Sequence, residues 1–240
     1  MSSLARTVHP ELLDSLPPDD PRAVRSRRDL RRINSWMLQT RTMAGALAKY
    51  CPQTPRHVLD LGTGDGTFML QVARRLASRW QGVTVTLLDR QNIVSAETQQ
   101  CFRAIGWLVK TVAADAFDFL QRDNPAIVDV ITTNLFLHHF PQIELARLLA
   151  LTAQRTDVLV ACEPRRAPLA LAASHLVWAI GCNGVSRHDA VVSVRAGFND
   201  GEISASWPEP GDWELHEGPK MLFTHCFVVR RTGSKLTWQT

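Results

Sequence analysis

Paired cysteines are missing from this sequence of 240 residues, which has five scattered cysteines and no C-x-x-C motif. An odd, dispersed set argues against a disulfide framework and against a zinc site, and it favours a reducing compartment. The first residues also lack the apolar segment that a secretion signal needs. We therefore expect a cytoplasmic protein.

Long apolar runs and a strong charge bias are missing as well. The most apolar stretch, residues 167–181, is too short for an easy membrane span and contains His175, so a buried or lid helix is expected there and no membrane partner. The net charge is +4 and the pI is near 9.0. Such a mild basic excess does not indicate a nucleic-acid partner by itself.

From residue 57 onward, short apolar runs alternate with helical patterns. This alternation is typical of α/β proteins with a mostly parallel sheet and right-handed crossovers. Two more strands near the end, around a predicted turn at Gly218-Pro219, are expected to form an antiparallel hairpin. The predicted strands cover residues 57–61, 83–88, 109–113, 128–132, 158–161, 213–215 and 223–229.

Residues 1–50 differ in pattern and are predicted to form a helical N-terminal cap, in which one amphipathic helix continues through Met43 and Leu47. Residues 51–240 form the main domain, with helices near 165–197 beside a substrate pocket. One of these helices is expected to begin with Ser186 as its N-cap and to end at Gly197. A hairpin around Asp200-Gly201 is the alternative for that region.

A glycine-rich loop follows the first predicted strand, with glycines at positions 62, 64 and 66. The spacing G-x-G-x-G differs from the G-x-G-x-x-G of dinucleotide sites. The loop also carries Asp60 and Asp65, which repel a pyrophosphate but suit a ligand with an ammonium and a sulfonium. The pattern favours a cationic nucleoside.

Two more carboxylates follow the next strands. Asp89 ends the second strand and is placed to accept both hydroxyls of a ribose. Asp115 follows the third strand and is expected to meet an adenine amino group, with Phe117 or Ile93 packed on the ring. Ligands of open α/β sheets bind at this edge.

The segments VLDLGTGDGTF, LLD and AADAF resemble the first three motifs of class I S-adenosylmethionine methyltransferases. The resemblance covers residues 58–163 and implies a Rossmann-like, seven-stranded sheet and S-adenosyl-L-methionine as cofactor. Within that class the chain looks closest to the small-molecule branch that includes quinone-biosynthesis methyltransferases. The residues implied in cofactor binding are Asp60, Gly62, Thr63, Gly64, Asp89, Arg90, Asp115, Ala116, Phe117 and Asn134.

The acceptor side is expected just past the fourth strand. His138 and His139 are candidate general bases, and the residues do not decide between them. Glu163 ends the fifth strand and is placed to orient one imidazole. No convincing set of metal ligands is found. Trp36, Met37, Phe136 and Trp178 suggest an aromatic pocket for a polyketide-like or quinone-like acceptor, methylated on oxygen or carbon.

Two alternatives remain open. The arginines between residues 22 and 32 would support an RNA methyltransferase, although the residues favour a solvated helix face and a small-molecule acceptor. The other alternative is a non-catalytic scaffold, against which the intact glycine loop and Asp89 argue. A homodimer is possible.

Overall fold

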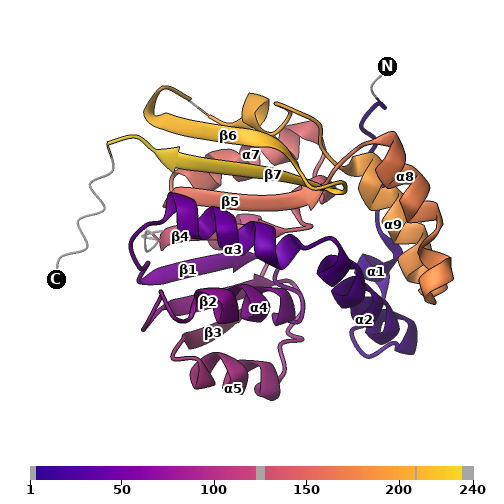
Figure 1. Cartoon of the computed structure of the whole chain (residues 1–240), viewed down its shortest axis with the longest axis horizontal. Helices are drawn as coiled ribbons and strands as arrows, with labels where there is room; N and C mark the ends of the chain where they lie inside the picture. The colour runs from indigo at the N-terminus through magenta and orange to yellow at the C-terminus, as the bar shows by residue number, and fades with distance from the viewer. Residues whose placement is uncertain (1–3, 123–127, 209, 234–240) are drawn as a thin grey trace.

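The computed structural model describes residues 4–122, 128–208 and 210–233. Its centre is a seven-stranded sheet in the order β3-β2-β1-β4-β5-β7-β6 (Figure 1). Neighbours from β3 to β5 are parallel, and β7 runs antiparallel to β5 and β6. The strands are β1 His57–Leu61, β2 Thr84–Asp89, β3 Leu108–Ala113, β4 Val128–Asn134, β5 Thr156–Pro164, β6 Trp213–Lys220 and β7 Thr224–Arg231. The Rossmann-like α/β sheet with a closing hairpin is confirmed.

Two helical layers cover the sheet. Because the parallel strands alternate apolar side chains toward both faces, each face needs its own cover. On one face lie α3 Gln39–Tyr50, α4 Thr67–Leu76 and α5 Ala96–Ala104, whose buried side chains share a core with β1 and β2. On the other lie α6 Ala116–Leu120 and α7 Gln142–Ala153.

The remaining helices gather at the carboxyl ends of the parallel strands (Figure 1). They place a helical lobe over the edge where ligands of this architecture bind. The lobe consists of α1 Leu12–Ser15, α2 Pro21–Trp36, α8 Pro168–His175, the short 3-10 helix η2 Val177–Ile180 and α9 Gly184–Ala196. Three further 3-10 helices are η1 Leu137–His139, η3 Ser204–Ser206 and η4 Pro210–Asp212.

The N-terminal helix is not continuous, contrary to the prediction. It breaks at Met37–Leu38, where Leu38 has a left-handed backbone with φ 53°. α2 therefore joins the lobe, whereas α3 packs on the sheet through Met43 and Leu47. Neither glycine nor proline marks the break, so the sequence carried no ordinary signal for it.

Two further local predictions were wrong. The Gly218-Pro219 pair lies inside β6, and the hairpin turns at 221–223, where Met221 has φ 62°. β6 is an edge strand, so a proline without an N–H is tolerated there. The helix at 184–196 is present in place of the alternative hairpin and ends at Gly197, but its N-cap is Asn183, whose Oδ1 accepts from Ser186 N at 2.8 Å.

Candidate active site

The glycine loop connects β1 to α4 with three left-handed residues. Gly62, Gly64 and Gly66 have φ of 70°, 56° and 73°. A Cβ on Gly62 would lie 2.3 Å from the Phe136 ring, whereas one on Gly64 would meet nothing within 4 Å. The loop thus packs tightly against the β4 end at Gly62 and presents open backbone at Gly64, where a ligand can approach closely.

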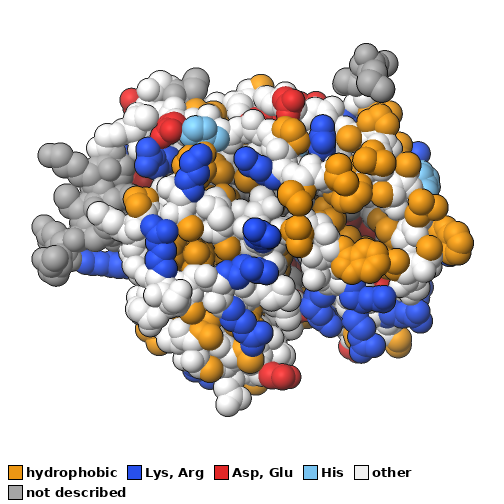
Figure 2. Space-filling model, viewed as in Figure 1, with side chains coloured by type: hydrophobic (Ala, Val, Ile, Leu, Met, Phe, Trp, Pro, Cys, Tyr) orange, Lys and Arg blue, Asp and Glu red, His pale blue; other side chains and the backbone are white. Residues whose placement is uncertain are grey.

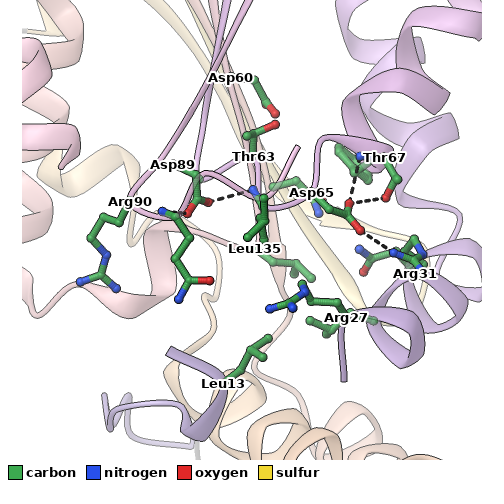
Figure 3. Close-up of a pocket in the computed structure, with 18 of the residues that line it drawn as sticks. Leu13, Arg27, Arg31, Asp60, Thr63, Asp65, Thr67, Asp89, Arg90 and Leu135 are labelled. Carbon is green, nitrogen blue, oxygen red and sulfur yellow. Dashed lines mark hydrogen bonds and ion pairs between the residues drawn. The ribbon is translucent and has the colours of Figure 1, made fainter. Parts of the chain in front are cut away.

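A cavity of about 440 Å³ opens in front of this loop (Figure 3). Its walls come from the ends of β1, β2 and β4, from α4, and from the facing side of α2. The lining includes Arg27, Leu30, Arg31, Asn34, Asp60, Gly62, Thr63, Gly64, Asp65, Gln71, Asp89, Arg90, Ile93 and Asn134. Most residues predicted to hold the cofactor therefore meet in one place.

Asp89 binds the loop that it faces. Its Oδ2 accepts from Gly64 N at 2.8 Å and its Oδ1 accepts from Gln91 N at 2.9 Å. Each carboxylate oxygen keeps a second lone pair for another donor. Its neighbour Arg90 also lines the cavity, and its guanidinium lies 3.9 Å from the Asp14 carboxylate.

The two loop carboxylates differ in their surroundings. Asp60 is buried and accepts from Thr132 Oγ1 at 2.7 Å, and burial raises its pKa to about 6. Asp65 instead forms an ion pair with Arg31 of α2 and caps α4 by accepting from Thr67 N at 3.0 Å (Figure 3). The sequence suggested that both acids are available to a cationic ligand, whereas the charge of Asp65 is already balanced by Arg31.

A second cavity of about 660 Å³ adjoins the first and shares Leu13, Asp14, Leu30, Gly62, Asp89, Arg90 and Leu135 with it. Asp115 and Ala116 line it at the end of β3. Phe117 does not line either cavity, because its ring packs edge-on against Phe140 at 5.6 Å between centroids. Of the two residues expected against an adenine, Ile93 is the one on a cavity wall.

His138 lies between two carboxylates in this second cavity. Its Nδ1 is 2.8 Å from Glu163 Oε2, and its Nε2 is 3.2 Å from Glu11 Oε1. Burial lowers the pKa of His138, but the two carboxylates outweigh it and raise the pKa to about 9. The imidazole is therefore protonated at neutral pH, and a protonated ring cannot take up a proton.

Glu163 also holds the turn after β4. Its Oε1 accepts from the backbone N–H groups of Phe136 at 3.0 Å and Leu137 at 2.9 Å. The carboxylate is fully buried, and although burial favours its neutral form, the His138 charge and these donors lower its pKa. Its hydrogen-bond distance to one imidazole, that of His138, is consistent with the predicted orienting role, which stays a prediction.

His139 has different partners. Its Nδ1 lies 3.4 Å from Asp14 Oδ2, and its ring is tilted by 34° against the His138 ring, with centroids 4.3 Å apart. Burial and the neighbouring His138 charge both lower the pKa of His139. Its side chain lines the second cavity and is 22% exposed. A neutral, cavity-facing imidazole beside a carboxylate is suited to accept a proton.

Glu11 and Asp14 were missed by the sequence analysis. They belong to an N-terminal segment that is attached to α9. The two carboxylate oxygens of buried Asp189 accept hydrogen bonds from the backbone N–H groups of Leu12 at 2.8 Å and Leu13 at 3.0 Å. Ser193, one turn further, donates to Glu11 Oε1. The only available signal was an acid at each end of the segment ELLD, and nothing local ties this segment to residues 138 and 139.

Several predicted pocket residues lie elsewhere. Trp36 and Trp178 are 68% and 57% exposed and line neither of these cavities, nor does Met37, whereas Phe136 lines the second one. Within residues 165–197, Ser193 lines the second cavity, but no residue of α8 does. Ser186 is buried against α2, where its hydroxyl lies 3.1 Å from Asp29 Oδ2.

A possible metal arrangement exists at the same place. Ligand-type atoms of Glu11, His138 and His139 lie within 4.8 Å of one another. Both ring nitrogens of His138 already face carboxylates at hydrogen-bond distance, so the cluster is satisfied by its own charges. The metal-free assignment stays a prediction.

A family model described as a methyltransferase domain matches residues 58–157. A search of curated proteins gives no significant match. The matched residues run from β1 into β5 and include the glycine loop, Asp89, Asp115 and both histidines.

Solved structures share the fold at low identity. An O-methyltransferase family protein from Burkholderia thailandensis has a TM-score of 0.62 at 19% identity, covering 90% of this chain and 62% of that one. The plantazolicin methyltransferase BpumL in complex with SAH has 0.61 at 13%, covering 89% and 91%. The mitomycin 7-O-methyltransferase MmcR has 0.57 at 19%, covering 92% and 60%. The chain thus spans less than two thirds of the length of two of these relatives.

Residues 58–157 thus match a methyltransferase domain, and the whole sheet shares the fold of solved methyltransferases. None of the helices in the described ranges is long and apolar enough to cross a membrane.

Proposed function

We propose that this enzyme transfers a methyl group from S-adenosyl-L-methionine to a small aromatic, polyketide-like or quinone-like acceptor. The observation that carries the proposal is the pair of adjoining cavities at the carboxyl ends of the strands. One is lined by the glycine loop and Asp89, and the other by the two histidines. The BpumL neighbour, whose structure is a complex with SAH, supports the choice of cofactor.

The residues present fit this cofactor. Asp89 has free lone pairs for ribose hydroxyls, and Asp115 stands at the β3 end for the adenine. Gly64 leaves backbone open to the ligand, and the Oδ1 of Asn134 is buried with no hydrogen-bond partner among the described residues. An unpaired buried acceptor is a strong indication of a missing donor. When bound, the cofactor supplies an electrophilic methyl group on a sulfonium.

His139 is the base that the geometry favours. The Asp14 carboxylate lies beside its Nδ1 atom and leaves Nε2 as the ring nitrogen that accepts the proton of an acceptor hydroxyl or enol. His138, held between Glu11 and Glu163, keeps its charge and fixes the turn on which His139 sits. Its charge also stabilises negative charge that develops on an acceptor oxygen. Whether oxygen or carbon is methylated depends on the acceptor, and Val8, Pro10, Phe136 and Phe140 make its cavity partly apolar.

Calorimetric titration with S-adenosylhomocysteine tests the cofactor assignment. We expect micromolar binding by the native protein and at least tenfold weaker binding by Asp89→Ala. The matched control is Asp118→Ala, since Asp118 is an exposed carboxylate of α6 that lines neither cavity. No binding by the folded native protein at millimolar ligand would overturn the enzyme proposal and favour the scaffold. Equal affinity in both variants would reject only the role of Asp89.

RNA remains the other acceptor to test, because α2 displays arginines on one face of the molecule (Figure 2). Part of that charge is already engaged: Arg31 pairs with Asp65, and Arg25 and Arg32 donate to the carbonyls of residues 181 and 180. A small-molecule acceptor predicts methylation that is insensitive to salt. A steep loss of affinity for RNA between 50 and 200 mM salt, of the ~10³-fold size expected for proteins with many phosphate contacts, would favour RNA.

A further inference from the structure

One side of α2 forms a wall of the first cavity. Arg27, Leu30, Arg31 and Asn34 all line it, at the i, i+3, i+4 and i+7 spacing that places side chains on one helix face. Figure 3 shows Arg31 directed at Asp65 of the glycine loop, and Arg27 lying between that loop and Leu13. The N-terminal helix therefore faces the cofactor cavity directly.

Two asparagines face this cavity from opposite sides, Asn34 on α2 and Asn134 at the end of β4. The Oδ1 of each is buried and has no hydrogen-bond partner among the described residues. Buried amide oxygens without a donor are rare in folded proteins, because they lose their hydration and gain nothing in return. Two such atoms on the walls of one cavity indicate a ligand that brings donors.

The charges around the asparagines indicate the chemistry of that ligand. A carboxamide offers one acceptor and two donors, and so suits a zwitterion that carries an ammonium and a carboxylate. The guanidinium of Arg27 adds positive charge on the α2 side, and its hydrogen bond to the Pro18 carbonyl leaves other N–H donors available. Asp60 adds a carboxyl group on the sheet side.

We propose that α2 completes the cofactor site and selects its α-amino-acid end. The ammonium donates to the amide oxygens of Asn34 and Asn134, and the carboxylate faces Arg27. This assignment rests on the proposed cofactor. Asp89 and Gln91 hold the opposite, ribose end of the same cavity. The N-terminal cap thereby acts in cofactor binding, whereas the sequence suggested only that its Trp36 and Met37 belong to the acceptor pocket.

The test compares two ligands that differ only at this end. S-adenosylhomocysteine carries the amino-acid group and 5′-methylthioadenosine lacks it. We expect Asn34→Leu to weaken the first ligand at least tenfold and to leave the second within twofold. Arg27→Gln should show the same selectivity independently. Ser35→Ala, an exposed position next to Asn34, is the control and should change neither affinity.

The outcomes separate the two proposals. If native protein binds neither ligand, the proposed function itself fails. If native protein binds both, and Asn34→Leu and Arg27→Gln weaken both ligands equally or neither, the role of α2 at the amino-acid end is wrong while the cofactor assignment stands. Thermal unfolding of each variant excludes a folding defect as the cause of equal losses.

Discussion

The buried charge of His138 makes a specific prediction about stability and pH. The pKa of His138 is raised from 6.5 to about 9 in the folded protein. Between these values the unfolded chain has released this proton and the folded chain still holds it. The free energy of unfolding must therefore fall as pH rises, by about 1.4 kcal/mol per pH unit for one proton.

Summed from pH 6.5 to 9.5, this loss is about 3 kcal/mol. For a chain of this length it corresponds to a decrease of roughly 6–12 °C in the melting temperature. The contribution is fully present below pH 6.5 and is gone above about pH 9. Thermal or urea unfolding of the native protein across this range measures it.

The matched variant is His138→Gln, which keeps a donor for one carboxylate but does not titrate. Because the His138 charge also lowers the pKa of Glu11 and Glu163, the difference between the pH profiles isolates His138 at pH values where both carboxylates stay ionised in the variant. The variant should lose about 3 kcal/mol less than the native protein between pH 6.5 and 9.5. Parallel profiles would refute the protonated assignment and return His138 to the list of candidate bases.

Two further predictions concern His139 and the glycine loop. His139→Ala should lower turnover by about 10²–10⁴-fold with unchanged affinity for S-adenosylhomocysteine. Asp14→Asn should lower turnover by a smaller factor. Because the pKa of His139 is lowered, the activity of the native protein should persist below pH 6.5 and fall only as His139 becomes protonated. Activity of His139→Ala equal to native would remove it from the mechanism. Gly62→Ala places a methyl group 2.3 Å from an aromatic carbon and should destabilise the fold by roughly 1–3 kcal/mol in urea unfolding, more than Gly64→Ala, whose new methyl group meets nothing within 4 Å. Equal stability of the two variants would contradict the close packing at Gly62.

The parts of the site that follow from local rules were predictable. Parallel strands end at one edge of a sheet, so Asp60, Asp89 and Asp115 had to lie near one another once the strands were recognised. Glu163 is close to His138 for the same reason, because β4 and β5 are neighbours. These contacts depend on strand order alone.

Other contacts depend on long-range packing that no local pattern encodes. Glu11 lies 127 positions from His138 in the chain, and Asp189 and Ser193 of α9 help to hold the N-terminal segment beside that histidine. The different protonation of the two histidines follows from that contact. The sequence could therefore present them only as an unresolved pair.

The break at Leu38 was hidden for a local reason. Leucine rarely adopts a left-handed backbone, so the helical spacing of apolar residues continued across the break without interruption. Burial of Met43 on the sheet and of Asp29 against α9 outweighs the cost of this conformation.

The attachment of α2 to the 180–186 segment has a consequence for protein engineering. Asp29 is almost fully buried and accepts from Asn183 N at 2.8 Å and from the Ser186 hydroxyl at 3.1 Å. A chimera that exchanges α8, α9 and the segment between them for those of a relative, to alter the choice of acceptor, would remove these two donors from the carboxylate and loosen α2. Residues 21–36 and 168–196 should therefore be transferred as one block, despite the 131 positions between them in the chain.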